Sequence, residues 1–304
     1  MPYNTLLGES IQRTYRRVSS ARRPYGVLIT NPIITRITSM KATVKNQESS
    51  FFVTDDNGSF KKREFAKKYE FTGETIEVGF KTLHRIRALR DFGDVKKGDL
   101  GGFIGSEYNL SHHGNCWVGG KAKVYANARV YDNAVVSGYA HVNVEACIYE
   151  NARVYGKAVV GGFVYGNAEV YGFARIYPRA RIYGNAHVHY NAWVFNDTHI
   201  FGNAKLSGYA CIYADVKVYG NAKVLGFSKL YKNAHVHGNA VIEGHAEIHG
   251  IIYGNAKISG YSKIYGKVSG KAKLRECDFV HREGEVYSGN KVIYNSNNIL
   301  EKAA

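Results

Sequence analysis

One aliphatic residue recurs every six positions along most of the chain, and this spacing determines the predicted fold. The aliphatic position is filled from Val118 to Val292, with the spacing shortened to four after Val160, Ile248 and Ile264. The residue two positions before each aliphatic is nearly always Ala, Gly or Ser. Residues two apart on a strand point to the same side, so these large and small residues are predicted to fill one narrow core.

A longer period of 18 residues appears when the six-residue units are sorted by threes. One corner carries Asn, the next carries mainly aromatic residues, and the third contains every shortening. The Asn column consists of Asn133, Asn151, Asn167, Asn185, Asn203, Asn221, Asn239 and Asn255. The next corner holds Tyr139, Lys157, Phe173, Asn191, Tyr209, Phe227, His245 and Tyr261. The chain is therefore predicted to be all-β, a three-sided parallel β-solenoid of about ten coils with a small N-terminal β cap.

The corner residues have expected roles in bending the chain. Asn and Gly tolerate the left-handed backbone conformation, so the Asn column is expected to sit at such corners and to form a side-chain ladder. The shortened corners are centred on Gly162, Gly250 and Gly266. We expect their missing Cβ atoms to permit a tighter bend.

The rest of the chain is predicted from changes in this pattern. Residues 1–39 are basic and aperiodic, which indicates a flexible arm or an upstream extension before a native start at Met40. Residues 40–117 are predicted to form a β-rich cap that covers the open end of a solenoid spanning 118–294. Residues 295–304 are predicted to cover the last coil.

Within the cap, D-N-G at 56–58 predicts a hairpin between two apolar runs. Residues 69–80 alternate around a second expected turn, residues 82–92 are predicted as a strand or short helix, and 94–104 as a turn into a strand. The glycines at 98–105 have no helical pattern after them, so they do not predict a dinucleotide-binding loop.

Composition limits the partners and the compartment. The net charge of +16 favours anionic partners such as nucleic acid, nucleotides or phosphorylated sugars, although solubility alone is an alternative explanation. No apolar run approaches the roughly 20 residues of a membrane span, so no membrane partner is expected. The four cysteines (116, 147, 211 and 277) lack metal-like spacing, which suggests reduced thiols in the cytoplasm.

The repeat, aliphatic-x-x-x-small-x on three sides, resembles the left-handed parallel β-helix of the hexapeptide-repeat acyltransferases. The likeness covers about residues 83–292 and implies the left-handed coil. Residues 83–118 are similar to the entry segment of an enterobacterial acetyltransferase-like branch with relatives in bacteria and phages, which suggests a phage or prophage origin. The similar steps are Asp91–Gly98, Gly101–Ile104, Asn109–Ser111 and Gly114–Val118. The acetyltransferase label of that branch rests on its repeats, so the likeness implies acetyl transfer only to the extent that the repeats do.

Histidines are the candidates for catalysis, because acyltransferases of this superfamily use a His general base beside a loop that leaves the coil. The outward-facing histidines are His141, His187, His189, His199, His235, His237 and His249. His187 with His189, and His235 with His237, flank a buried position and are the candidates for a catalytic role. No corner from Val118 to Val292 is longer than the standard unit, so no loop is predicted to form a pocket.

A metal site is not predicted at these histidines. His187 and His189 share a face, but the residues expected beside them, among them Glu169 and Lys205, do not complete a metal-binding set. No cofactor is expected either, apart from acetyl-CoA if the chain is an acyltransferase.

Aromatic residues in register along two faces are the candidates for ligand binding. The ligand candidates are Tyr131, Tyr149, Tyr165, Tyr183 and Tyr219, with Arg129, Arg181 and Lys217 between them. The second face carries Tyr125, Tyr177, Phe195, Tyr213, Tyr231 and Tyr265. Aromatic rings with cations can stack bases and hold phosphates, but they can also stack on each other or form an oligomer interface.

The sequence therefore favours a non-catalytic scaffold or binding module with a basic, Tyr-rich surface. A homo-oligomer, a dimer or a trimer, is expected. One alternative is an acyl-CoA-dependent acyltransferase with a site between subunits. A second is sequestration of a nucleotide or another anionic small molecule; nucleic acid is a weaker candidate.

Overall fold

The computed structural model describes residues 50–54, 60–64, 66–213, 215–288 and 293–294. Internal contacts divide the chain into units 1–46 and 47–304, and everything described lies in the second. The expected arm over 1–39, the Met40 start and the expected tail over 295–304 lie outside the described residues.

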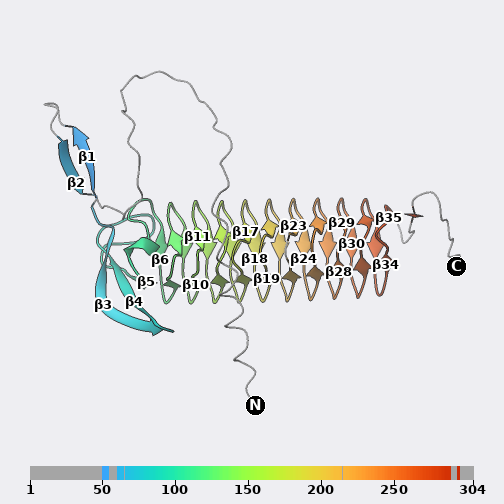
Figure 1. The fold of residues 1–304 in the computed structure, drawn as a ribbon, viewed down its shortest axis with the longest axis horizontal. Helices are drawn as coiled ribbons and strands as arrows, with labels where there is room; N and C mark the ends of the chain where they lie inside the picture. The colour runs from blue at the N-terminus through green and yellow to red at the C-terminus, as the bar shows by residue number, and fades with distance from the viewer. Residues whose placement is uncertain (1–49, 55–59, 65, 214, 289–292, 295–304) are drawn as a thin grey trace, which may run out of the picture. The chain divides into compact units, whose positions relative to one another are not determined.

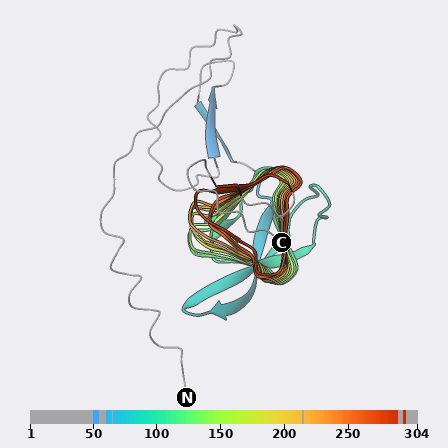
Figure 2. The same cartoon turned by 90° about the vertical axis from the view of Figure 1, so that its right-hand side faces the viewer.

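Short parallel strands build a three-sided solenoid, as predicted (Figure 1). Viewed along the long axis of the solenoid, the three sheets enclose a triangular cross-section (Figure 2). Sheet 1 contains β7 (Lys123–Val124), β10 (His141–Val142), β13 (Val159–Val160), β16 (Arg175–Ile176), β19 (Trp193–Val194), β22 (Cys211–Ile212), β25 (Lys229–Leu230), β28 (Glu247–Ile248), β31 (Lys263–Ile264) and β34 (Phe279–Val280).

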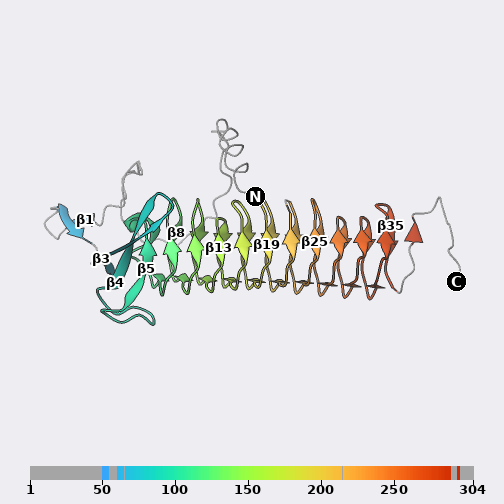
Figure 3. The same cartoon turned by 90° about the horizontal axis from the view of Figure 1, so that it is seen from below.

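The other two sheets repeat this arrangement coil by coil (Figure 3). Sheet 2 contains β8 (Arg129–Val130), β11 (Cys147–Ile148), β14 (Phe163–Val164), β17 (Arg181–Ile182), β20 (His199–Ile200), β23 (Lys217–Val218), β26 (His235–Val236), β29 (Ile251–Ile252), β32 (Lys267–Val268) and β35 (Gly284–Val286), then the antiparallel β36 (Ile293–Tyr294). Sheet 3 contains β6 (Trp117–Val118), β9 (Val135–Val136), β12 (Arg153–Val154), β15 (Glu169–Val170), β18 (His187–Val188), β21 (Lys205–Leu206), β24 (Lys223–Val224), β27 (Val241–Ile242), β30 (Lys257–Ile258) and β33 (Lys273–Leu274).

The core is the predicted one. The aliphatic residue of each coil strand from β6 to β35 is buried, and so are the alanines two positions earlier. Where a hydroxyl replaces Ala, it bonds to the backbone: Ser228 Oγ donates to the Leu225 carbonyl at 2.7 Å, and Ser262 Oγ to the Ser259 carbonyl at 2.8 Å. A buried hydroxyl with a partner avoids the cost of an unpaired polar group.

The left-handed residues stand one position before the Asn column, which corrects the expectation that Asn itself takes this conformation. The φ angle is 57° at Asp132 and 55° at Glu150, and Gly occupies the equivalent position in the following coils. Glycine adopts positive φ without a Cβ penalty, which explains its recurrence. The expected Asn ladder is confirmed: each side-chain amide from Asn133 to Asn239 donates to the next Asn at 2.9–3.2 Å.

The shortened corners all lie between sheet 1 and sheet 2, as predicted. The pairing of Ile148 with Val164 spans 16 residues, whereas the next step on the same sheet spans 18. A Cβ atom on Gly162 would lie 2.5 Å from the Ala180 carbonyl oxygen. Close approach of neighbouring coils, and not only the bend, therefore requires glycine there.

The cap is an antiparallel extension of sheet 1. It consists of β3 (Tyr69–Val78), β4 (Lys81–Ala88) and β5 (Leu100–Ile104), and β5 then pairs in parallel with β7. The segment predicted as a strand or short helix is the strand β4. The turn expected within 69–80 lies at the end of β3, where Gly79 and Phe80 connect Val78 to its partner Lys81; β3 also contains a bulge between Phe71 and Thr75. The predicted hairpin pairs β1 (Ser50–Thr54) with β2 (Phe60–Glu64).

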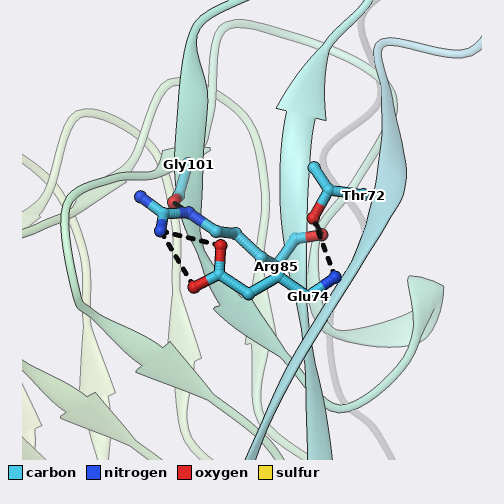
Figure 4. A network of polar contacts seen from close by, with 4 residues as sticks. All are labelled: Thr72, Glu74, Arg85 and Gly101. Carbon is cyan, nitrogen blue, oxygen red and sulfur yellow. Dashed lines mark hydrogen bonds and ion pairs between the residues drawn. The ribbon is translucent and has the colours of Figure 1, made fainter.

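Polar contacts fix the bulge to β5 (Figure 4). The Arg85 guanidinium contacts both carboxylate oxygens of Glu74 at 3.0 and 3.1 Å, and its Nε donates to the Gly101 carbonyl at 3.2 Å. The Thr72 hydroxyl donates to the Arg85 carbonyl and accepts from the Glu74 amide. One arginine therefore links all three cap strands.

The short 3-10 helix η1 (Glu107–Asn109) leads the chain from the cap into the first coil. The side chain of Asn109 is buried, and its amide donates to the carbonyls of Ala126 at 3.0 Å and Ala128 at 2.7 Å. Its carbonyl accepts from the Ser106 amide at 2.9 Å. Asn109 thus satisfies backbone carbonyls that no earlier coil is present to pair.

Candidate binding surface

The predicted aromatic register is confirmed as a continuous stack, which we name the Tyr column. It contains Tyr131, Tyr149, Tyr165, Tyr183, Phe201, Tyr219, His237 and Tyr253. Ring centroids are 4.7–5.2 Å apart and ring planes differ by at most 10°. Burial by neighbouring rings raises the pKa of Tyr149 to about 12. The hydroxyl therefore stays neutral at physiological pH.

The ring faces of the Tyr column are already occupied by each other. A base inserted between two rings would need roughly 7 Å between them, twice a normal aromatic stacking distance. The column therefore offers ring edges and hydroxyls along its length, and open faces only at its ends.

The cations predicted beside the Tyr column lie on sheet 2 but are not adjacent to each other. Arg129 lies over the rings of Tyr108 and Tyr131, with centroid distances of 4.9 and 5.9 Å. Arg181 lies 5.6 Å from the ring centroid of Phe163. In register order, Cys147 and Phe163 separate Arg129 from Arg181, and His199 precedes Lys217.

A shallow hollow at the first coil brings two predicted ligand residues together. Arg129 and Tyr131 line it with Tyr108, His113 and Asp132. Tyr108 comes from η1, which sequence patterns did not connect with the Tyr column. This hollow is open and adjoins the cap, so it is a surface feature and not an enclosed pocket.

Two further aromatic stacks contain histidines that the sequence pattern did not assign to an aromatic column. The second face stacks from Tyr177 through Phe195, Tyr213, Tyr231 and His249 to Tyr265, so His249 belongs to this column. The third face also holds a stack, of Tyr155, Tyr171 and His189, with ring centroids 4.8 Å apart. His stacks in a Tyr position because its ring is also flat.

The candidate catalytic histidines lie on open faces. His187 Nδ1 is 3.6 Å from Glu169 Oε2, and that carboxylate also accepts from the Tyr155 hydroxyl at 3.0 Å. His237 stacks between Tyr219 and Tyr253. Corners between the coil strands are uniformly short, as predicted, so no corner among the residues that the structure describes encloses these imidazoles. Among the described residues, no group of three or more His, Cys, Asp and Glu could hold a metal ion.

Acid is expected to weaken the stacks. Burial, the main cause, lowers the pKa of His189, His237 and His249. The folded chain then binds fewer protons than the unfolded chain, so their stabilisation is complete above the unfolded pKa of roughly 6.5 and is lost as pH falls. We expect the melting temperature to fall between pH 7.5 and pH 5.5. A variant with all three changed to Tyr should show a smaller fall; an equal fall would contradict this account.

An exposed aromatic corner and a lysine row were not predicted as a joint surface. The aromatic corner is Tyr139, Phe173, Tyr209, Phe227, His245 and Tyr261; its tyrosines and phenylalanines are 49–61% exposed. The lysine row is Lys205, Lys223, Lys257 and Lys273 on sheet 3, all exposed. Each of the first three lysines precedes an aromatic of this corner by four residues, so both features share the same coils.

The fold and the stacked faces define the class: this is a β-solenoid repeat protein. The chain is similar to a family model described as the YdcK beta solenoid repeat over residues 123–143, 146–162 and 174–190. A search of the curated proteins finds no match. No helix in the described part of the chain is long and apolar enough to cross a membrane. The left-handed coil and the acyltransferase affiliation stay predictions from the resemblance.

Proposed function

We propose that this chain is a rigid, non-catalytic binding module that presents a cationic and aromatic surface to an extended anionic partner. The observation that carries the proposal is the lysine row. Lys205 pairs in register with Lys223, and Lys257 with Lys273, on adjacent strands of sheet 3. Their side chains therefore leave the sheet about 4.8 Å apart.

Like charges at this separation repel each other unless an anion lies between them. Directly opposed like charges destabilise a sheet, and only salt screens them at an exposed site. Among the described residues, none of the four lysines belongs to an ion pair, whereas Lys263 on sheet 1 contacts Glu247 at 3.2 Å. An anionic partner that bridges neighbouring lysines would remove this repulsion.

The straight stack of coils supports an extended partner over a small ligand. The sheet 3 strands that carry the row succeed one another along the long axis of the solenoid (Figure 1), with Val241 between the two lysine pairs. The aromatic corner follows the same strands by a few residues in each coil. Tyr209, Phe227, His245 and Tyr261 stack at 4.7–5.0 Å and form a continuous apolar edge. The absence of an extruded loop among the coil corners supports a non-catalytic role. Acetyl-CoA turnover by the purified protein would overturn that part.

A labelled single-stranded oligonucleotide serves as the polyanion probe. We expect its affinity to fall with salt, and the triple variant Lys205→Gln, Lys223→Gln, Lys257→Gln to lower the log–log salt slope by about 2, since each phosphate contact contributes about 0.7. Fluorescence anisotropy at several salt concentrations measures the slope.

A matched variant separates the two surfaces. Arg129→Gln, Arg181→Gln, Lys217→Gln removes the same charge from sheet 2, where the sequence placed the ligand candidates. Loss confined to the lysine-row variant supports the proposal, and loss confined to the sheet 2 variant moves the site to the Tyr column. Equal losses indicate a net-charge effect, and no binding by the unchanged protein overturns the proposal. Circular dichroism confirms that both variants fold.

A further inference from the structure

The side chain of Lys68 is completely buried where the cap meets the first coil. Its Nζ donates to the carbonyl oxygen of Cys116 at 2.7 Å and reaches those of His113 and Gly114 at 3.4 Å. The ammonium group also lies over the Phe92 ring, 4.9 Å from its centroid. A buried lysine is rare unless it is paired, and none of these contacts is a carboxylate.

Within the part of the chain that the structure describes, the one ionisable group in hydrogen-bond contact with the Lys68 amine is a thiol. Cys116 is also fully buried, and its Sγ lies 3.1 Å from Lys68 Nζ. Burial lowers the pKa of Lys68 and raises that of Cys116, while the attraction between the two groups opposes both shifts; Arg90 adds to the lowering at Lys68. The pair can therefore lose its charges together, as a neutral amine beside a neutral thiol.

We propose that Lys68 and Cys116 are the site of an oxidative crosslink in which one oxygen atom bridges Lys68 Nζ and Cys116 Sγ, with dioxygen as the oxidant. One N–H bond of the amine, the S–H bond and the O–O bond break, and an N–O and an S–O bond form. The two released hydrogens leave with the second oxygen atom as water. Nitrogen and sulfur each lose two electrons, and the two oxygen atoms gain the four.

The geometry restricts this reaction to one of the four cysteines. Cys147 and Cys211 project outward from strands of sheets 2 and 1, and Cys277 is exposed. Cys211 does have a lysine beside it, because it pairs in register with Lys229. That pair lies on the outer face, and its thiol donates instead to the Tyr209 carbonyl at 3.6 Å. It serves as an internal control with the same two functional groups.

The crosslink would join residues that are 48 positions apart in the sequence. Closing such a loop removes conformational freedom from the unfolded chain. It would also tie the start of β3 to the strand that opens the first coil, β6, because Lys68 and Cys116 immediately precede them. Oxidation at this site would thus fasten the cap to the solenoid.

Mass spectrometry of the full chain tests the proposal. Protein purified in air should carry a peptide joining Lys68 to Cys116, heavier than the sum of its parts by one oxygen and lighter by two hydrogens. Trypsin should fail to cleave after Lys68 in that species, and a thiol reductant should restore cleavage. Protein prepared without oxygen should show a free Cys116 after unfolding and alkylation.

The mass spectrometry of the unchanged protein is sufficient to test the proposed crosslink. A free Cys116 thiol in air, a bridge without the added oxygen, or an equal crosslink at Cys211 and Lys229 would overturn the proposal. Cys116→Ser and Lys68→Arg should each abolish the joined peptide. The result is independent of polyanion binding, because the proposed anion surface lies on other coils.

Discussion

Replacing Gly102 with Ala is expected to lower the free energy of unfolding by about 3 kcal/mol, because the new methyl group has no space. An added Cβ would lie 2.5 Å from the Ala122 carbonyl oxygen and 2.9 Å from Val118 Cγ1. The cap strand β5 must then move away from the first coil, or that coil must open. Urea denaturation followed by circular dichroism measures the loss.

Gly119→Ala is the matched control for this substitution. Its added Cβ would meet the Trp117 ring at 3.4 Å, an ordinary contact, and its backbone is not left-handed. We expect a change within about 0.5 kcal/mol. Equal denaturation midpoints for the two variants would show that the close approach of β5 is not essential.

Removing the Asn109 side chain is expected to cost about 2–4 kcal/mol, because Asn109→Ala leaves two backbone carbonyls and one amide without partners at a buried site. These groups belong to Ala126, Ala128 and Ser106, at 2.7–3.0 Å. The comparison is Asn203→Ala, which breaks two exposed ladder bonds of 3.1 and 3.0 Å. Water can replace those bonds, so its cost should stay below about 1 kcal/mol.

Thermal unfolding of the two Asn variants distinguishes capping from ladder formation. A larger loss at Asn203 than at Asn109 would mean that the ladder, and not the entry segment, is the main polar support. A larger loss at Asn109 agrees with the need of any solenoid end for cover.

The repeat could be predicted because the same pattern of large and small residues recurs in every coil. A buried aliphatic such as Val188 and a small residue such as Ala186 recur in every coil, so the period, the three sides and the shortened corners all follow from spacing. The stacks followed for the same reason, since residues one coil apart must lie side by side. The Asn ladder and the two longer aromatic stacks could therefore be predicted from the sequence.

The cap and the binding surface were harder to predict because they depend on contacts outside the period. Nothing in the spacing places Lys68 against Cys116, or indicates that Arg85 links three strands. The aromatic corner was visible as a column, but only its exposure shows that it protrudes. The lysine row was not predictable as a site because a charged residue at an outward position is ordinary in a single coil and becomes significant only beside its copies in neighbouring coils.

The order of the elements has a consequence for synthesis on the ribosome. The cap precedes the coils in the chain, and each later coil strand pairs with one only 16 or 18 residues earlier. Each newly synthesised coil can therefore pair with a coil that has already formed, and no strand depends on a partner from the far end of the chain. Assembly can proceed as templated growth in one direction, in which β5 is the seed and each coil becomes the template for the next.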